Sequence, residues 1–157
     1  MAGRVEWVLL AYRIPREPST PRITVWRKLK RLGVAQIVDG LVALPLDART
    51  KEQLEWIADE IIDASGEATI WVGRLGSVRQ ERALASRMAA SVAEEYQAVV
   101  DAAQEAADDA AMSSRTLARL RRELRRIGQR DYFPPVQRER AHQAVGTLAN
   151  AVETTSR

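Results

Sequence analysis

One stretch of this 157-residue chain, PRITVWRKLKRLGVAQIVDGLVALP (residues 21–45), constrains the fold more than any other. Proline suits the first turn of a helix, where its missing N–H has no partner to lose, and glycine commonly ends a helix. With Thr20 as the N-cap, the stretch predicts a helix that ends at Gly33. One side of this helix is apolar (Val25, Trp26, Leu29, Leu32) and the other is basic (Arg27, Lys28, Lys30, Arg31).

Two short apolar runs, residues 35–38 and 41–44, follow this helix and are separated by Asp39-Gly40. Asp-Gly is favoured in two-residue turns of type I′, in which both turn residues need a positive φ. These features predict a β-hairpin closed by a type I′ turn.

The flanking segments complete a recognisable order of elements. Residues 5–12 are apolar on both alternating faces, which is typical of a central strand covered on both sides. Thr50 and Gln53 match a capping box before a second helix that would end at Gly66, and residues 68–72 match a last strand. The order βαββαβ predicts a ferredoxin-like sandwich over residues 1–76.

Residues 77–157 show helical periodicity throughout. A capping box of Ser77 and Gln80 opens a long helix, and Ser114 is the expected N-cap of the next helix, which Gly128 would end. Pro135 would begin the last helix. The class is therefore α+β: the sandwich followed by three mainly antiparallel helices that pack on it.

The four tryptophans all lie in the first half of the chain, at positions 7, 26, 56 and 71. We expect most of them in the core. Trp56 is the exception, because it falls on the side of its helix opposite Leu54 and Ile57. It is either part of an interface or an ordinary half-exposed residue.

Composition limits the class of protein. With 46% hydrophobic residues the chain can bury a substantial core, and no apolar run approaches the roughly 18 residues of a membrane span. The N-terminal residues run directly into a strand pattern, so we expect a cytoplasmic protein without a membrane partner. The absence of cysteine excludes disulfides and thiolate metal sites within the chain.

Charge is segregated along the chain despite a net charge of only +3. Residues 1–49 carry +5, residues 50–112 carry −8 and residues 113–157 carry +6. Four arginines of the fourth helix follow steps of four, three and four, which form a basic ridge opposite its leucine stripe. Basic helix faces of this kind bind phosphate backbones. The candidate nucleic-acid-binding residues are Arg27, Lys28, Lys30, Arg31, Arg115, Arg119, Arg122 and Arg126.

Two other interpretations of the charges stay open. The acidic third helix could neutralise the basic fourth helix inside one molecule. The chain could also be an interaction module that binds a separate sensor or enzyme subunit through Trp56 and this acidic helix. DNA affinity that collapses with salt would support nucleic-acid binding, whereas tight, salt-insensitive binding to a protein would support the module.

The residues give little support to catalysis. His142 is the only histidine, and it lies on a predicted helix without a cysteine or a serine elbow to act with. The adjacent acids Glu94-Glu95 and Asp108-Asp109 point about 100° apart on a helix and so do not converge on a metal. We therefore predict no enzyme, no catalytic or metal site and no cofactor.

Several segments resemble the N-terminal domain of the chromate-resistance regulator ChrB. They are WVLLAYRIP, TVWRKLKRLG and DGLVALP, followed by Tyr96 in a long helix and the basic segment LRRELRRIGQRDYF (residues 120–133). The resemblance implies a transcription-regulatory role in chromate or other oxyanion and metal stress. Together with the basic helix faces, it predicts a regulator that binds DNA, and we expect a homodimer. Larger members of that family carry a further C-terminal domain, so sensing would require a separate sensory domain or subunit.

The first strand and helix also resemble the small CRISPR-associated ferredoxin-like nucleases and the middle domain of the phenylacetate-pathway (PaaX-type) repressors. In those nucleases an aspartate at the end of the first strand binds the metal. Arg13 stands at that position here, and a guanidinium repels Mg²⁺. The resemblance therefore implies the fold without the nuclease activity.

Overall fold

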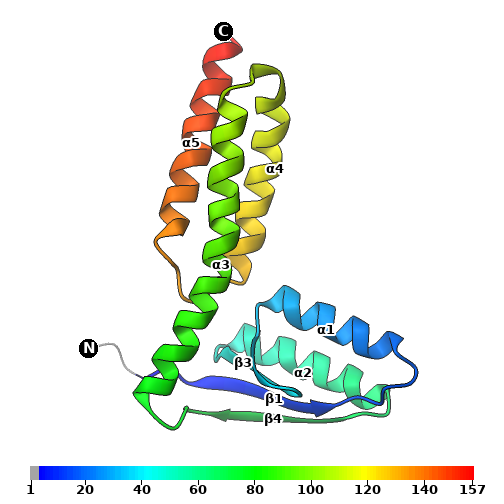
Figure 1. Ribbon diagram of the computed structural model, residues 1–157. Coiled ribbons are helices and arrows are strands. Elements are labelled where there is room, and N and C mark those ends of the chain that lie inside the picture. The colour runs from blue at the N-terminus through cyan, green and yellow to red at the C-terminus, as the bar shows by residue number, and fades with distance from the viewer. Residues whose placement is uncertain (1–3) are drawn as a thin grey trace. The chain divides into compact units, whose positions relative to one another are not determined.

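The computed structural model describes residues 4–157, which divide into two compact units, residues 4–85 and 86–157. We describe each unit by itself (Figure 1). The longest helix, α3 (Val78–Ala107), begins in the first unit and continues into the second. The expected division after residue 76, and the expected packing of the helices on the sandwich, stay predictions.

The first unit has a four-stranded antiparallel sheet in the order β2-β3-β1-β4. This order and the alternation of strands and helices confirm the ferredoxin-like start of an α+β protein. The strands are β1 (Trp7–Arg13), β2 (Ala35–Val38), β3 (Leu41–Pro45) and β4 (Glu67–Gly73), and the helices are α1 (Thr20–Leu32) and α2 (Ala48–Asp63).

Both helices of this unit lie on the same face of the sheet (Figure 1). Val8 and Leu10 of β1 are paired with Leu44 and Val42 of β3, and all four side chains are fully buried. Because paired residues point to the same face, these side chains form the sheet's contribution to the core. The helices contribute the buried residues Val25, Leu29, Leu54, Ile57 and Ile61.

The hairpin is present, but its turn is not type I′. Of the two turn residues, Gly40 has a positive φ of 78° and Asp39 does not. The pairing also shifts, because Gln36 faces Val42 whereas Val38 faces Leu41. One extra residue in β2 therefore closes the hairpin with a bulge and a single left-handed glycine, a geometry that the Asp-Gly pair also permits.

Two helix starts of the first unit differ from expectation. The N-cap of α1 is Ser19 rather than Thr20, and its side chain makes no capping bond. The capping box of α2 pairs Asp47 with Thr50 instead of Thr50 with Gln53: the Thr50 N–H donates to Asp47 Oδ1 (2.7 Å) and the Asp47 N–H donates to Thr50 Oγ1 (2.9 Å). A carboxylate is the better acceptor at a helix start, so the acid takes the cap.

The second unit is built from α3, α4 (Ala110–Gln129) and α5 (Gln137–Thr155), which lie side by side (Figure 1). The N-cap of α4 is Asp109, five residues before the expected Ser114, and its side chain accepts from the Ala111 N–H (3.0 Å). The helix also continues through Gly128, where we expected it to end. One apolar core joins the three helices through Val92, Tyr96, Val99, Ala103, Leu117, Leu120, Leu124, Ile127, Ala141, Val145 and Leu148.

A polar contact crosses this core at the end of α4. The Tyr96 hydroxyl donates to Asp131 Oδ2 over 2.8 Å, and Tyr96 is only 1% exposed. Burial, and then the hydrogen bond to Asp131, raises the pKa of the Tyr96 phenol well above its ordinary value. The bond ties the loop between α4 and α5 to α3, and the neighbouring Tyr132 and Phe133 are half-buried.

The tryptophans depart from expectation. Trp7 is fully buried and Trp56 is 60% exposed, but Trp26 and Trp71 are exposed as well. Trp71 lies on the edge strand β4 and is paired with Leu9 of β1. It therefore points to the sheet face that α1 and α2 do not cover. The alternation of residues along a strand predicts which sheet face a residue points to, but the packing of the helices decides whether that face is buried.

No helix in the part of the chain described here is both long and apolar enough to cross a membrane.

We predict that Gly40→Val lowers the free energy of unfolding by about 3 kcal/mol in urea denaturation. Valine would have to adopt a positive φ, and its Cβ would lie 2.6 Å from the Tyr12 carbonyl oxygen. Gly128→Ala is the matched control, because its Cβ would meet no atom within 4 Å and alanine favours the helix. An unchanged midpoint for Gly40→Val would contradict the described hairpin.

We predict that Tyr96→Phe lowers the free energy of unfolding by about 2 kcal/mol, because it removes a buried hydrogen bond to a charged acceptor. Folding favours the neutral phenol. Stability from this group is therefore complete below its ordinary pKa of 10.0 and falls as the pH rises above that value, and Tyr96→Phe should reduce this alkaline loss. Gln97→Ala, which removes an exposed 3.0 Å bond to Asp101, is the control and should change stability by less than about 0.5 kcal/mol. Equal effects of the two variants would refute the assignment.

Candidate nucleic-acid interface

A ridge of four arginines runs along α4, on the side opposite its buried stripe. We call Arg115, Arg119, Arg122 and Arg126 the α4 ridge; all four side chains are exposed. Their spacing keeps them within an arc of about 60° on a helix with 3.6 residues per turn. The buried Leu117, Leu120, Leu124 and Ile127 occupy the opposite arc, so the contacts that hold the second unit together leave the ridge uncovered.

Within the described chain, most of the α4 ridge has no acidic partner. Arg126 contacts Glu123 of its own helix (3.2 Å), but this pair is exposed and weak. Arg115, Arg119 and Arg122 have no ion pair among the residues described. An ion pair that does join α3 to α4 connects Glu95 with Arg130, whose Nε lies 3.2 Å from Glu95 Oε2.

Further exposed arginines of the second unit lie outside the α4 ridge and were not among the sequence candidates. Arg121 and Arg125 are exposed on one flank of α4, and Arg138 and Arg140 are exposed in the first turns of α5. The spacing of three and four residues predicts only the arginines on one side of α4, so it does not include these further arginines. Counting every arginine outside the buried stripe would have found Arg121 and Arg125.

The basic residues of α1 form a second surface, in the first unit. Arg27 and Arg31 are exposed, and no ion pair of theirs occurs in the described part of the chain. Lys28, in contrast, forms a salt bridge with Glu60 of α2. The Lys30 ammonium lies 5.6 Å from the centroid of the Trp26 ring, a cation–π contact on the protein's own surface. Two of the four α1 candidates thus have partners within the protein.

These two basic surfaces belong to different units, α1 to the first and α4 to the second. The structure brings the four arginines of the α4 ridge together, and it places the four α1 residues on one helix. Each surface is therefore a candidate site by itself.

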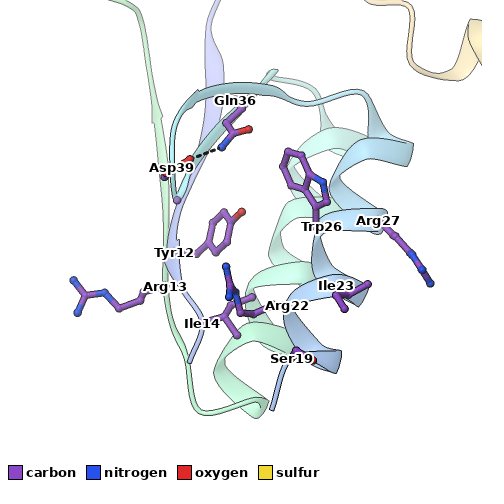
Figure 2. A pocket seen from close by; sticks show the side chains of 11 residues that line it. Tyr12, Arg13, Ile14, Ser19, Arg22, Ile23, Trp26, Arg27, Gln36 and Asp39 are labelled. Atoms are coloured by element: carbon purple, nitrogen blue, oxygen red, sulfur yellow. Dashed lines mark hydrogen bonds between the residues drawn. The ribbon is translucent and has the colours of Figure 1, made fainter. Parts of the chain in front are cut away.

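An open cleft of about 810 Å³ lies between α1 and the end of β1 (Figure 2). The Tyr12 ring and the Trp26 indole face its interior, and the Arg22 guanidinium is turned toward Tyr12, whereas Arg13 and Arg27 at the margin point away from it. At the hairpin end, the Gln36 amide donates to Asp39 Oδ1 (3.1 Å).

The electrostatics of this cleft are visible at Tyr12. Burial raises the pKa of its phenol above the ordinary value, the nearby Asp39 carboxylate raises it further, and the Arg22 guanidinium opposes both effects. The phenol therefore stays neutral near pH 7 and can act as a hydrogen-bond donor. Both charged groups lie close enough to act on whatever occupies the cleft.

Neither basic surface contains a candidate metal site within the described chain. The described residues contain no group of three or more histidine and acidic side chains that could hold a metal ion. Arg13 is exposed at the end of β1, the position compared with the nuclease metal ligand, and His142 is exposed on α5.

Comparison with known proteins identifies one family. The family described as "Protein ChrB, N-terminal" matches residues 22–157, which is most of the chain. No curated protein and no solved structure matches the chain. The match begins inside α1 and includes both the α1 and α4 basic surfaces.

We predict that replacing Arg119, Arg122 and Arg126 together by Glu changes the free energy of unfolding, measured in urea, by no more than about 0.5 kcal/mol per site. This is the change expected of surface substitutions. These side chains are exposed, on the side of α4 opposite its buried residues. Arg130→Glu should instead destabilise by about 1–3 kcal/mol, because it breaks a half-buried pair and places two carboxylates together. If the triple variant lost stability as Arg130→Glu does, the α4 ridge would be paired with the acidic helix, and the nucleic-acid interpretation would lose its basis.

Proposed function

We propose that this chain, which belongs to the family of ChrB N-terminal domains, is a DNA-binding transcription regulator linked to resistance against chromate or other oxyanion and metal stress. It acts without catalysis and without a cofactor of its own. The α4 ridge supplies the main contact with the DNA phosphates, and the α1 basic surface supplies a second.

The observation that carries this proposal is the α4 ridge. From Arg115 to Arg126 the helix rises about 16 Å, at about 1.5 Å per residue. Over that length of axis, duplex DNA carries roughly ten phosphate charges. Four exposed guanidiniums, three of them without an ion pair in the described chain, match such a target in sign and extend over the same length. Arginine also binds phosphate oxygens in a bidentate manner, which fixes orientation as well as affinity.

The ridge explains affinity for DNA in general rather than for one sequence. Contacts to phosphates position a protein, whereas contacts to base edges specify the sequence. Regulators commonly obtain further specificity by binding two half-sites as a symmetric dimer, and we propose a homodimer on this ground. A separate sensory domain or subunit would then control it.

A second function, an interaction module for such a subunit, rests on Trp56. Its indole is 60% exposed on α2, and an exposed tryptophan is the kind of residue that anchors protein interfaces. However, its helical neighbours Glu52, Asp59 and Glu60 are acidic, so the apolar surface is small. DNA binding therefore remains the proposed function, with the module as its rival.

The test is binding to duplex DNA from the protein's own promoter region as a function of salt. Wild-type protein should lose affinity steeply with salt. The triple variant with Arg119, Arg122 and Arg126 replaced by Glu should show a shallower slope of log K against log salt, by about 0.9 for each phosphate that the protein no longer neutralises. A matched control replaces Arg16, Arg79 and Arg82, which are exposed outside both basic surfaces, by Glu. It changes the net charge equally and should leave most of the slope intact.

Two results would overturn the proposal: no DNA binding by the wild type at about 50 mM salt, or equal slopes for the triple variant and its control. If a protein partner instead bound tightly and without salt dependence, and Trp56→Ala abolished that binding, the interaction module would replace it.

A further inference from the structure

We propose that the cleft between α1 and the end of β1 binds a small organic anion with a planar apolar body, such as an aromatic carboxylate. This inference goes beyond DNA binding and does not depend on it. It rests on the size of the cleft, on the distribution of polar and apolar groups along its walls, and on an arginine inside it that has no acidic partner among the described residues.

The size and the walls of the cleft suit a small molecule. Its volume of about 810 Å³ falls within the range of about 300–1,000 Å³ that is common for ligand sites. On one side, α1 presents Ile23 and Trp26, which are 48% and 36% exposed. On the other side, the end of β1 presents the ring of Tyr12 and the side chain of Ile14 (Figure 2). A flat ring between these walls would cover apolar surface that is now in contact with water.

The polar groups define where the anion would lie. Arg22 projects into the cleft toward Tyr12 (Figure 2), and no ion pair of Arg22 is present in residues 4–157. A guanidinium offers a planar pair of N–H donors that matches a carboxylate, and the neutral Tyr12 hydroxyl can donate a further hydrogen bond. The carboxylate would therefore lie between Arg22 and Tyr12, with the ring extending toward Trp26.

The remaining charges narrow the class of ligand. Asp39 lines the same cleft and lies near enough to Tyr12 to affect its titration. Its negative charge disfavours a ligand that carries several charges, such as a nucleoside triphosphate. A small inorganic oxyanion would satisfy Arg22 but would leave Ile14, Ile23 and Trp26 uncovered. A singly charged aromatic anion satisfies both ends of the cleft.

The test uses isothermal titration calorimetry of the full chain with three probes, benzoate, 1-naphthoate and indole-3-carboxylate, at constant ionic strength. At least one probe should bind saturably, with one site per chain. Sulfate and the neutral analogue 1-naphthamide should bind at least about tenfold more weakly than the best aromatic carboxylate. Sulfate lacks the aromatic ring, and 1-naphthamide lacks the carboxylate.

Variants separate this site from general attraction to a basic protein. Arg22→Gln and Trp26→Ala should each weaken the best probe by at least about tenfold. Arg31→Gln is the matched control, because Arg31 is exposed on the same helix and does not line the cleft, and it should leave binding unchanged. Thermal unfolding of each variant verifies that it is folded, and Ile23→Ser provides a second change to the apolar wall.

The proposal is overturned if none of the three probes binds, if sulfate binds as well as the best probe, or if Arg31→Gln weakens binding as much as Arg22→Gln. It is also overturned if folded Trp26→Ala and Ile23→Ser variants both retain full affinity.

Discussion

The pairing of β1 with a neighbour on each side is the constraint on which the first unit depends. Both neighbours run antiparallel to β1, and the chain passes very close to the end of this strand at two glycines. The Gly40 carbonyl accepts from the Tyr12 N–H (2.8 Å), and a Cβ at Gly66 would lie 2.4 Å from the Arg13 carbonyl oxygen. The hairpin and the end of α2 thus converge on the last residues of β1. The cleft opens at this end of β1, where Tyr12 is half-buried, beyond the fully buried Val8 and Leu10.

In the second unit the same arginine-rich helix carries both the packing and the proposed function. Its apolar residues at steps of three and four fill the core shared with α3 and α5, and the residues between them face outward. A change to the outward residues therefore leaves the core intact, which makes the proposed function testable without unfolding the protein. The acidic charge of α3 satisfies Arg130 at the end of α4, close to the Tyr96–Asp131 bond, and this cluster fixes the loop that follows.

DNA binding and ligand binding would use different residues of α1. Arg27 lines the margin of the cleft but points away from it, and it belongs to the α1 basic surface, whereas Arg22 points inward. Trp26 contacts both surfaces: the Lys30 ammonium of the α1 basic surface lies near its ring, and its indole faces the cleft. One short helix can thus offer cations to a phosphate backbone and an aromatic wall to a small ligand, because adjacent residues on a helix point in different directions.

Local sequence determined the order βαββαβ, the three later helices and the buried stripe of α4, because periodicity and turn residues depend on neighbours along the chain. It also identified the eight basic candidates, including the α4 ridge. The tertiary structure decided what depends on residues far apart. The exposure of Trp26 and Trp71 depends on which sheet face the helices cover, and the turn at Gly40 depends on β1, whose Tyr12 N–H donates to the Gly40 carbonyl. Lys28 is paired because α2 places Glu60 beside it. The cleft could not be predicted, since Tyr12, Arg22, Gln36 and Asp39 come from separate elements and share no sequence pattern; only the packing of α1 against the sheet brings them to one place.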